Sequence, residues 1–80
     1  MGRSRRRSAV KVDYALLKLE LAGEALREAG PTERLEREAE WRACRAEALR
    51  RRRDLLIHRE AVGITNNAVL KELYPIPERP

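Results

Sequence analysis

The sequence has few of the side chains that build catalytic centres and large cores. Its 80 residues include one Cys, one His, one Trp, two Tyr and no Phe. A single Cys excludes an internal disulfide, and the isolated His58 and Cys44 lack the neighbours that a metal site requires. We therefore expect a chain that is not an enzyme, with no catalytic residue, no metal, no cofactor and no small-molecule substrate.

Long apolar runs are also missing. A membrane-spanning helix needs about 20 mainly apolar residues in succession, and the longest run here falls far short of that length. Charged residues interrupt the first apolar segment, which therefore lacks the core of a signal peptide. We expect a single small domain in the cytoplasm with no membrane span, a location that the single Cys also fits.

Charge is abundant and arranged in blocks. The chain has 18 Lys plus Arg against 13 Asp plus Glu, a net charge of +5. Residues 1–11 carry five basic residues and no acid, whereas residues 12–41 carry four basic and eight acidic residues. Residues 42–59 carry seven Arg and two acids. Residues 1–8 have no apolar residue after Met1, which predicts a flexible basic arm.

The segment from about residue 9 to residue 29 has the period of an amphipathic helix. Apolar residues recur there at alternating steps of three and four, which is a heptad pattern that needs a partner helix. This predicted seam contains Val12, Ala15, Leu19, Ala22, Leu26 and Ala29, and Tyr14, Leu21 and Ala25 widen it.

A second, longer helix is predicted from about residue 33 to residue 62. Gly30 suits the C-terminal end of the first helix, Pro31 cannot continue that helix, Thr32 suits an N-cap, and Gly63 suits the end of the second helix. The main seam is predicted at Leu35, Ala39, Ala46, Leu49 and Leu56, with Ala43 and Ile57 adjacent and with Arg42 and Arg53 interrupting it. A thinner stripe contains Trp41, Cys44, Ala48, Leu55 and Val62.

A short third helix is predicted at about residues 66–73, with Thr65 as its N-cap, followed by an extended Pro-rich tail at residues 74–80. The fold class is therefore all-α, an antiparallel helical hairpin with a short third helix. The second helix should overhang the first by roughly nine residues near its C-terminal end, where the third helix or another subunit would pack.

Two sets of basic residues are candidates for contact with nucleic-acid phosphates. One is the arm, for which an acidic protein surface, acidic lipid head groups or a role as a solvated tail are the alternatives. The other is a line of arginines spaced by seven residues on the second helix, for which salt bridges to acids of the first helix or of a neighbouring subunit are an equal alternative. The candidates are Arg3, Arg5, Arg6, Arg7, Lys11, Arg45, Arg52 and Arg59.

A further set of apolar residues is a candidate for contact with a protein partner. Trp41 lies off the main seam, where it either packs internally or anchors a partner, and the Pro-rich tail can lie in a partner's groove. The candidates are Leu19, Leu26, Trp41, Leu55, Tyr74 and Ile76.

Residues 52–73 resemble the first half of a bacterial helix-turn-helix module. An arginine-rich helix leads into a Gly-x-Thr step at Gly63 and Thr65, and Val69 and Leu73 fit the scaffold helix that follows. Tyr74-Pro75 stands in place of the usual Gly turn, and no recognition helix is present. The resemblance implies a truncated relative that does not read the major groove in the usual way.

Two functions remain open on the sequence. The first is a small helical accessory or regulatory protein that binds nucleic acid, with DNA expected before RNA, electrostatically through its basic arm. The second is a structural or regulatory interaction module, such as an assembly component or an inhibitor of a larger complex, that acts through its hairpin and Pro-rich tail. Both leave self-association or membership of a larger complex as an expectation.

Overall fold

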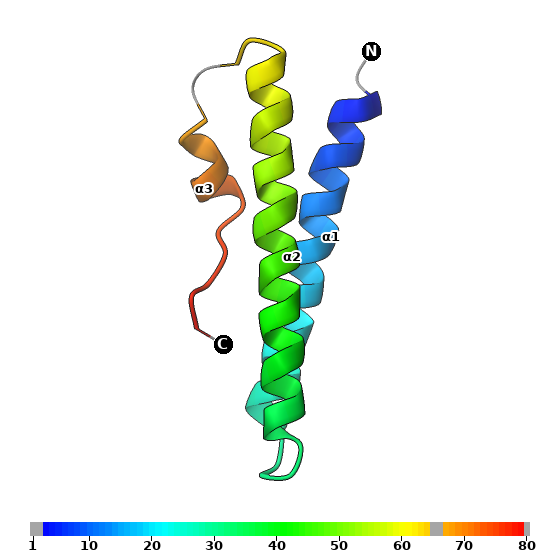
Figure 1. Cartoon of the computed structure of the whole chain (residues 1–80), viewed down its shortest axis with the longest axis vertical. Helices are drawn as coiled ribbons and strands as arrows, with labels where there is room; N and C mark the ends of the chain where they lie inside the picture. The colour runs from blue at the N-terminus through cyan, green and yellow to red at the C-terminus, as the bar shows by residue number, and fades with distance from the viewer. Residues whose placement is uncertain (1–2, 65–66, 80) are drawn as a thin grey trace.

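The structure, a computed structural model, describes residues 3–64 and 67–79, with side chains from residue 11 onward. It contains three helices, α1 (Arg3–Glu28), α2 (Arg34–Ala61) and α3 (Val69–Leu73), and no strand in these ranges. Helices α1 and α2 run antiparallel, and α3 and the tail return along α2 (Figure 1). The predicted all-α hairpin with a short third helix is therefore confirmed.

Helix α1 begins six residues earlier than predicted. Residues 3–8 are the first turns of α1 and not an irregular arm, while residues 1–2 lie outside the described ranges. Arg has a high helix propensity, so a helix nucleated further along the chain extends through this segment. As a result α1 has 26 residues against 28 in α2, and the predicted nine-residue overhang is absent.

The turn between α1 and α2 is closed by backbone groups. Thr32 was predicted as the N-cap of α2, but the cap position is Glu33, whose side chain makes no capping hydrogen bond. The carbonyl of Gly30 instead accepts hydrogen bonds from the amides of Glu33 and Arg34, both at 3.1 Å. Gly30 also lacks the positive φ predicted for a helix-terminating glycine. Tight backbone turns of this kind satisfy the first amides of a helix without a side chain.

The end of α2 matches its prediction. Gly63 has a φ of 91°, its amide donates to the carbonyl of Glu60 at 3.1 Å, and the amide of Ile64 donates to the carbonyl of Arg59 at 3.0 Å. This pair of hydrogen bonds is the Schellman motif, in which glycine adopts a left-handed conformation without a steric penalty. The predicted third helix is shorter than expected, Val69–Leu73, and its predicted cap, Thr65, lies outside the described ranges.

The seam of α1 is confirmed, but the main seam predicted for α2 is wrong. The buried residues of α2 are Trp41, Ala48 and Leu55, which belong to the thinner stripe, whereas Leu35 is 82% exposed. The predicted seam is interrupted by Arg42 and Arg53. Burying two unpaired guanidinium groups costs far more free energy than is gained by burying the Leu and Ala side chains of the same face. The thinner stripe carries no such charge at its buried positions.

Two small clusters form the core and set the register of the hairpin. Near the turn, Leu26 and Trp41 belong to the first cluster, which also holds Ala15, Leu19, Ala22 and Ala48. Towards the other end, Val12 of α1, Leu55 of α2 and Leu70 of α3 form the second cluster. The start of α1 therefore lies beside the end of α2, and α3 packs where the sequence placed it.

Candidate nucleic-acid interface

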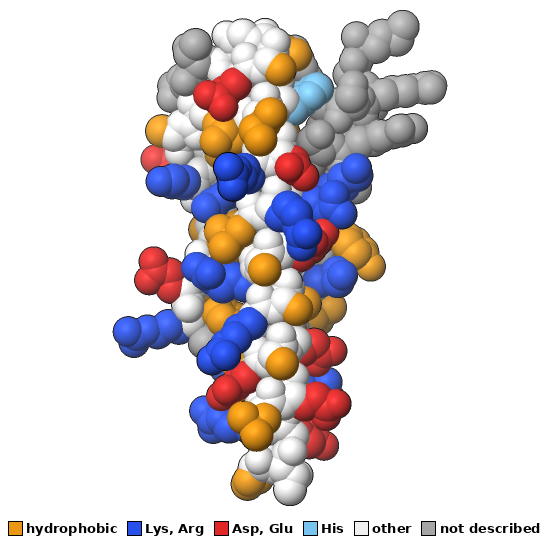
Figure 2. All heavy atoms as spheres, in the orientation of Figure 1, with side chains coloured by type: hydrophobic (Ala, Val, Ile, Leu, Met, Phe, Trp, Pro, Cys, Tyr) orange, Lys and Arg blue, Asp and Glu red, His pale blue; other side chains and the backbone are white. Residues whose placement is uncertain are grey.

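The antiparallel hairpin brings two basic blocks of the sequence to one end of the molecule. Because Val12 packs with Leu55, residues 3–11 lie beside the last turns of α2, which contain the arginines of residues 50–59 (Figure 1). The acidic residues of 33–40 lie near the hairpin turn, where Figure 2 shows several acidic side chains together. The molecule thus has a basic end and an acidic end, and we call the former, residues 3–11 and 50–59, the basic end.

Neighbouring arginines within the second block have different partners. Arg50 Nη2 and Arg51 Nε each lie 2.7 Å from a carboxylate oxygen of Glu47, one turn earlier on α2. Arg53 is exposed and makes no hydrogen bond or ion pair with the part of the chain that the structure describes. Consecutive helical positions point about 100° apart, so the four arginines do not form a single surface.

The three arginines spaced by seven residues hold the C-terminal segment of the same chain. We name residues 74–79 the C-terminal strap. Arg45 Nε donates to the carbonyl of Pro77 at 2.7 Å, and Arg52 Nη1 donates to the carbonyl of Tyr74 at 3.0 Å. Arg59 Nε donates to Asn67 Oδ1 at 2.7 Å, just before α3. The spacing places them on one line, as predicted, and within the chain their partners are backbone and amide oxygens instead of the carboxylates of α1.

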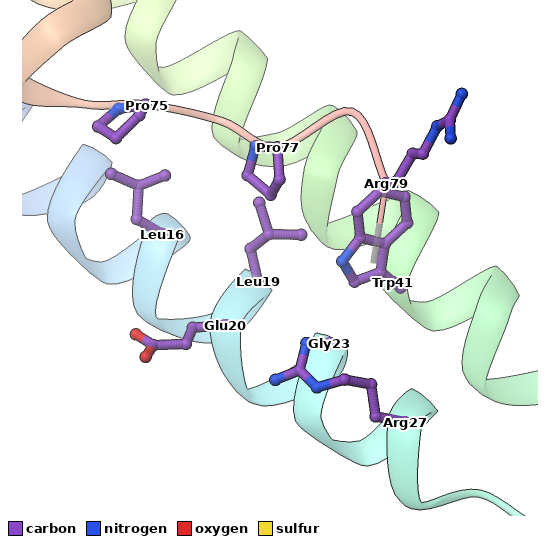
Figure 3. Close-up of a pocket in the computed structure, with 9 residues that line it drawn as sticks. All are labelled: Leu16, Leu19, Glu20, Gly23, Arg27, Trp41, Pro75, Pro77 and Arg79. Carbon is purple, nitrogen blue, oxygen red and sulfur yellow. The ribbon is translucent and has the colours of Figure 1, made fainter.

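Apolar contacts complete the attachment of the strap. Ile76 packs against the Trp41 cluster, and Tyr74 packs against the cluster of Val12, Leu55 and Leu70. Between the strap and the hairpin lies a hollow of about 430 Å³, where Pro77 lies over Leu19 and Arg79 lies beside the Trp41 ring (Figure 3). The remaining residues that line it are Leu16, Glu20, Gly23, Arg27 and Pro75.

Four of the six predicted protein-interaction residues are buried within the chain. Leu19, Leu26, Trp41 and Leu55 are each at most 7% exposed, and they join α1 to α2. The packing role expected for Trp41 is therefore present. Tyr74 and Ile76 are half-buried in the strap. Contact between any of the six and a separate protein stays a prediction.

Helix α1 also has an exposed apolar surface that the predicted seam does not account for. Tyr14, Leu17 and Leu21 are 62%, 52% and 55% exposed. Tyr14 and Leu21 also line open hollows at the edge of the contact between α1 and α2. The sequence predicts that Tyr14 and Leu21 widen the internal seam, but both are more than half exposed. The signal that separates them is their own spacing of three and four residues, which forms a second helical stripe alongside the first.

The remaining candidates for chemistry show no assembled site. Within residues 3–64 and 67–79, no group of three or more His, Cys, Asp or Glu is placed to hold a metal ion. No helix in this part of the chain has the length and apolarity to cross a membrane. Arg37 Nη1 donates a hydrogen bond to Glu40 Oε2 at 3.0 Å, and this bond with the charge of Glu40 raises the pKa of the exposed Arg37 guanidinium.

Comparison of the chain with protein-family models, curated proteins and solved structures gave no match. The resemblance of residues 52–73 to a helix-turn-helix module therefore stays a prediction. The structure assigns residues 52–61 of that stretch to the end of α2 and only Val69–Leu73 to the helix that follows.

Proposed function

We propose that this chain binds the phosphate backbone of nucleic acid, and of duplex DNA in particular, through its basic end. The observation that supports the proposal is the meeting of two basic blocks, 39 residues apart between Lys11 and Arg50, at one end of the hairpin. Lys and Arg residues gathered at one end of a domain are the electrostatic footprint of a protein that binds phosphates.

The binding is expected to be independent of base sequence. Residues 3–11 contain no aromatic side chain that would stack on a base, and α3 has only five residues, too few to lie along a major groove. Arg45 and Arg52 donate to the strap and Arg59 donates to Asn67, so the proposal gives the first role to Arg5, Arg6 and Lys11. A contribution from Arg45, Arg52 and Arg59 stays a prediction.

The salt dependence of binding tests this proposal. If the basic end neutralises about four or five phosphates, the logarithm of the association constant falls against the logarithm of salt concentration with a slope of roughly −4. Fluorescence anisotropy of a labelled duplex, measured between 25 and ~200 mM salt, gives that slope. No affinity at low salt, or an affinity that salt leaves unchanged, contradicts the proposal.

A matched pair of triple variants locates the surface. Replacing Arg5, Arg6 and Lys11 with Gln removes three positive charges from the basic end, and we expect a slope shallower by about three. The control replaces Arg34, Arg37 and Arg42 with Gln, which removes the same charge near the hairpin turn. Equal losses of affinity in both variants would show that net charge alone, and not the basic end, drives binding.

The alternative function, an interaction module, draws support from a different surface. The strap is tied to the hairpin, since Ile76 packs against the Trp41 cluster and Arg45 donates to the Pro77 carbonyl, while the side chains of Pro75 and Pro77 are exposed. The observation that favours an interaction with protein is the exposure of apolar side chains on α1. The order of residue types along this helix indicates the kind of partner that would fit them.

A further inference from the structure

The exposed side of α1 carries a complete heptad series. Tyr14, Leu17 and Leu21 lie at alternating steps of three and four residues and are each more than half exposed. The positions turn by about 100° per residue, so they form a stripe separate from the buried seam. Tyr14 and Leu21, on the edge of this stripe, also line hollows beside α2. We name the full series the outer stripe, and it consists of Arg3, Arg7, Val10, Tyr14, Leu17, Leu21, Glu24 and Glu28.

The order of residue types along the outer stripe is self-complementary. It begins with two basic residues, continues with four apolar ones and ends with two acidic ones. In an antiparallel pair of helices, each heptad core position packs beside the other kind of core position of its partner. One register then aligns the whole series, with Val10 facing Leu21, Tyr14 facing Leu17, and each Arg facing a Glu of the other copy. A parallel pair would instead place like charges together at both ends.

The surface area of the chain supports a missing partner. The chain exposes 6313 Å², whereas a compact monomer of its 9.3 kDa exposes about 5,000 Å². Its Cα radius of gyration is 14.6 Å, against about 12 Å for a compact domain of this length. The excess area exceeds the roughly 800 Å² that each partner buries in a standard protein interface.

From these three observations we infer that α1 binds a second copy of this chain, antiparallel, through its outer stripe. The resulting dimer has α1 of each copy at its centre and α2 of each copy outside. Arg5, Arg6 and Lys11 lie off the stripe and remain at the two basic ends, so this inference stands apart from the proposed function. Dimer formation and DNA binding can each be lost without the other.

Light scattering after size-exclusion chromatography tests the dimer with the full chain. We expect twice the mass of one chain at micromolar concentrations. Leu17→Glu with Leu21→Glu should weaken dimerisation at least about tenfold, because each change places a charge in the apolar middle of the interface. Both side chains are exposed, so the far-ultraviolet circular dichroism of the monomer should be unchanged. The control is Leu35→Glu with Ile57→Glu, on the exposed side of α2, which should leave the dimer intact.

Disulfide trapping tests the direction and the register. In a Cys44→Ser chain, we expect Val10→Cys and Leu21→Cys proteins to form a mixed disulfide when combined, and each to cross-link poorly with itself. Efficient self-cross-linking of either protein would overturn the antiparallel arrangement. A monomeric parent chain at ~1 mM, a concentration at which weak pairing becomes visible, would overturn the dimer itself. The inference would also be overturned if the α2 control, Leu35→Glu with Ile57→Glu, disrupted the dimer while Leu17→Glu with Leu21→Glu left it intact.

Discussion

A few apolar residues hold all three helices together. Val12, Leu55 and Leu70 come one from each helix, and none is more than 6% exposed. A domain of this size has few such contacts, so each accounts for a large share of a net stability that is only a few kcal/mol. The exposed leucines of the chain contribute almost nothing to this stability.

We expect Leu55→Ala to lower the free energy of unfolding by about 2–4 kcal/mol, because it leaves a cavity between the three helices. The control is Leu35→Ala, at a position that is 82% exposed, which should change the stability by less than ~0.5 kcal/mol. Urea denaturation followed by circular dichroism measures both. Similar losses in the two variants would contradict the assignment of the core to the thinner stripe of α2.

The glycines give a second comparison at the residue scale. Gly63→Ala should destabilise the chain by about 1 kcal/mol or more, because φ is 91° there and the Schellman motif depends on it. Gly23 lies in the middle of the α1 sequence. A Cβ added there would lie 3.5 Å from Trp41 Nε1, which is an ordinary van der Waals distance. Gly23→Ala should therefore stabilise the helix by up to about 1 kcal/mol. Thermal unfolding of the two variants, compared with the parent chain, tests these opposite signs.

At the scale of elements, α2 shows what sequence periodicity can and cannot establish. The end of α1, both ends of α2 to within about one residue, the turn and the seam of α1 were predictable, because each has a local cause in period or breaker residues. The start of α1, the N-cap of α2 and the start of α3 were not. The face of α2 that packs on α1 was not. Helix α2 has two apolar stripes, and either could face α1. The stripe that packs is the one that keeps Arg42 and Arg53 out of the core. The partners of Arg45, Arg52 and Arg59 depend on the return path of the strap, which no local pattern encodes.

The strap should control the surroundings of the single Trp. Ile76 packs against the Trp41 cluster, so Ile76→Ala should loosen the strap and shift the Trp41 fluorescence maximum to longer wavelength as water reaches the ring. Leu73→Ala removes an equally large side chain that is 60% exposed, and it should leave the maximum unchanged. A red shift in the control, or none in Ile76→Ala, would show that the strap does not shield the ring.

At the scale of the whole molecule, length and charge separation dominate. The principal extents are 49 × 22 × 14 Å, and ten of the 18 Lys and Arg residues belong to the basic end, residues 3–11 and 50–59. Like charges that folding brings together repel one another, and the repulsion is longest-ranged at low salt, where the Debye length is about 30 Å at 0.01 M against about 8 Å at 0.15 M. The basic end therefore strains the fold in the absence of an anion.

We expect the melting temperature to rise by a few degrees between 0.01 and ~0.2 M NaCl, as salt screens this repulsion. For the variant with Gln at positions Arg5, Arg6 and Lys11, the melting temperature should rise less over the same salt range, because the variant lacks part of the repulsion. For the variant with Gln at positions Arg34, Arg37 and Arg42, the melting temperature should rise with salt at least as much as that of the parent chain. A melting temperature that falls with salt in the parent chain would mean that attractive ion pairs outweigh the repulsion.

The register of the hairpin also has a consequence for the order of folding. Leu26 and Trp41 are 15 residues apart in the chain, whereas Val12 and Leu55 are 43 apart. Closing the shorter loop costs less entropy, so contacts should form first at the turn and spread towards the termini. The strap and α3 have no surface to bind until that process is complete. They therefore join after the rate-limiting barrier, and changes in them should speed unfolding while leaving the folding rate almost unaltered.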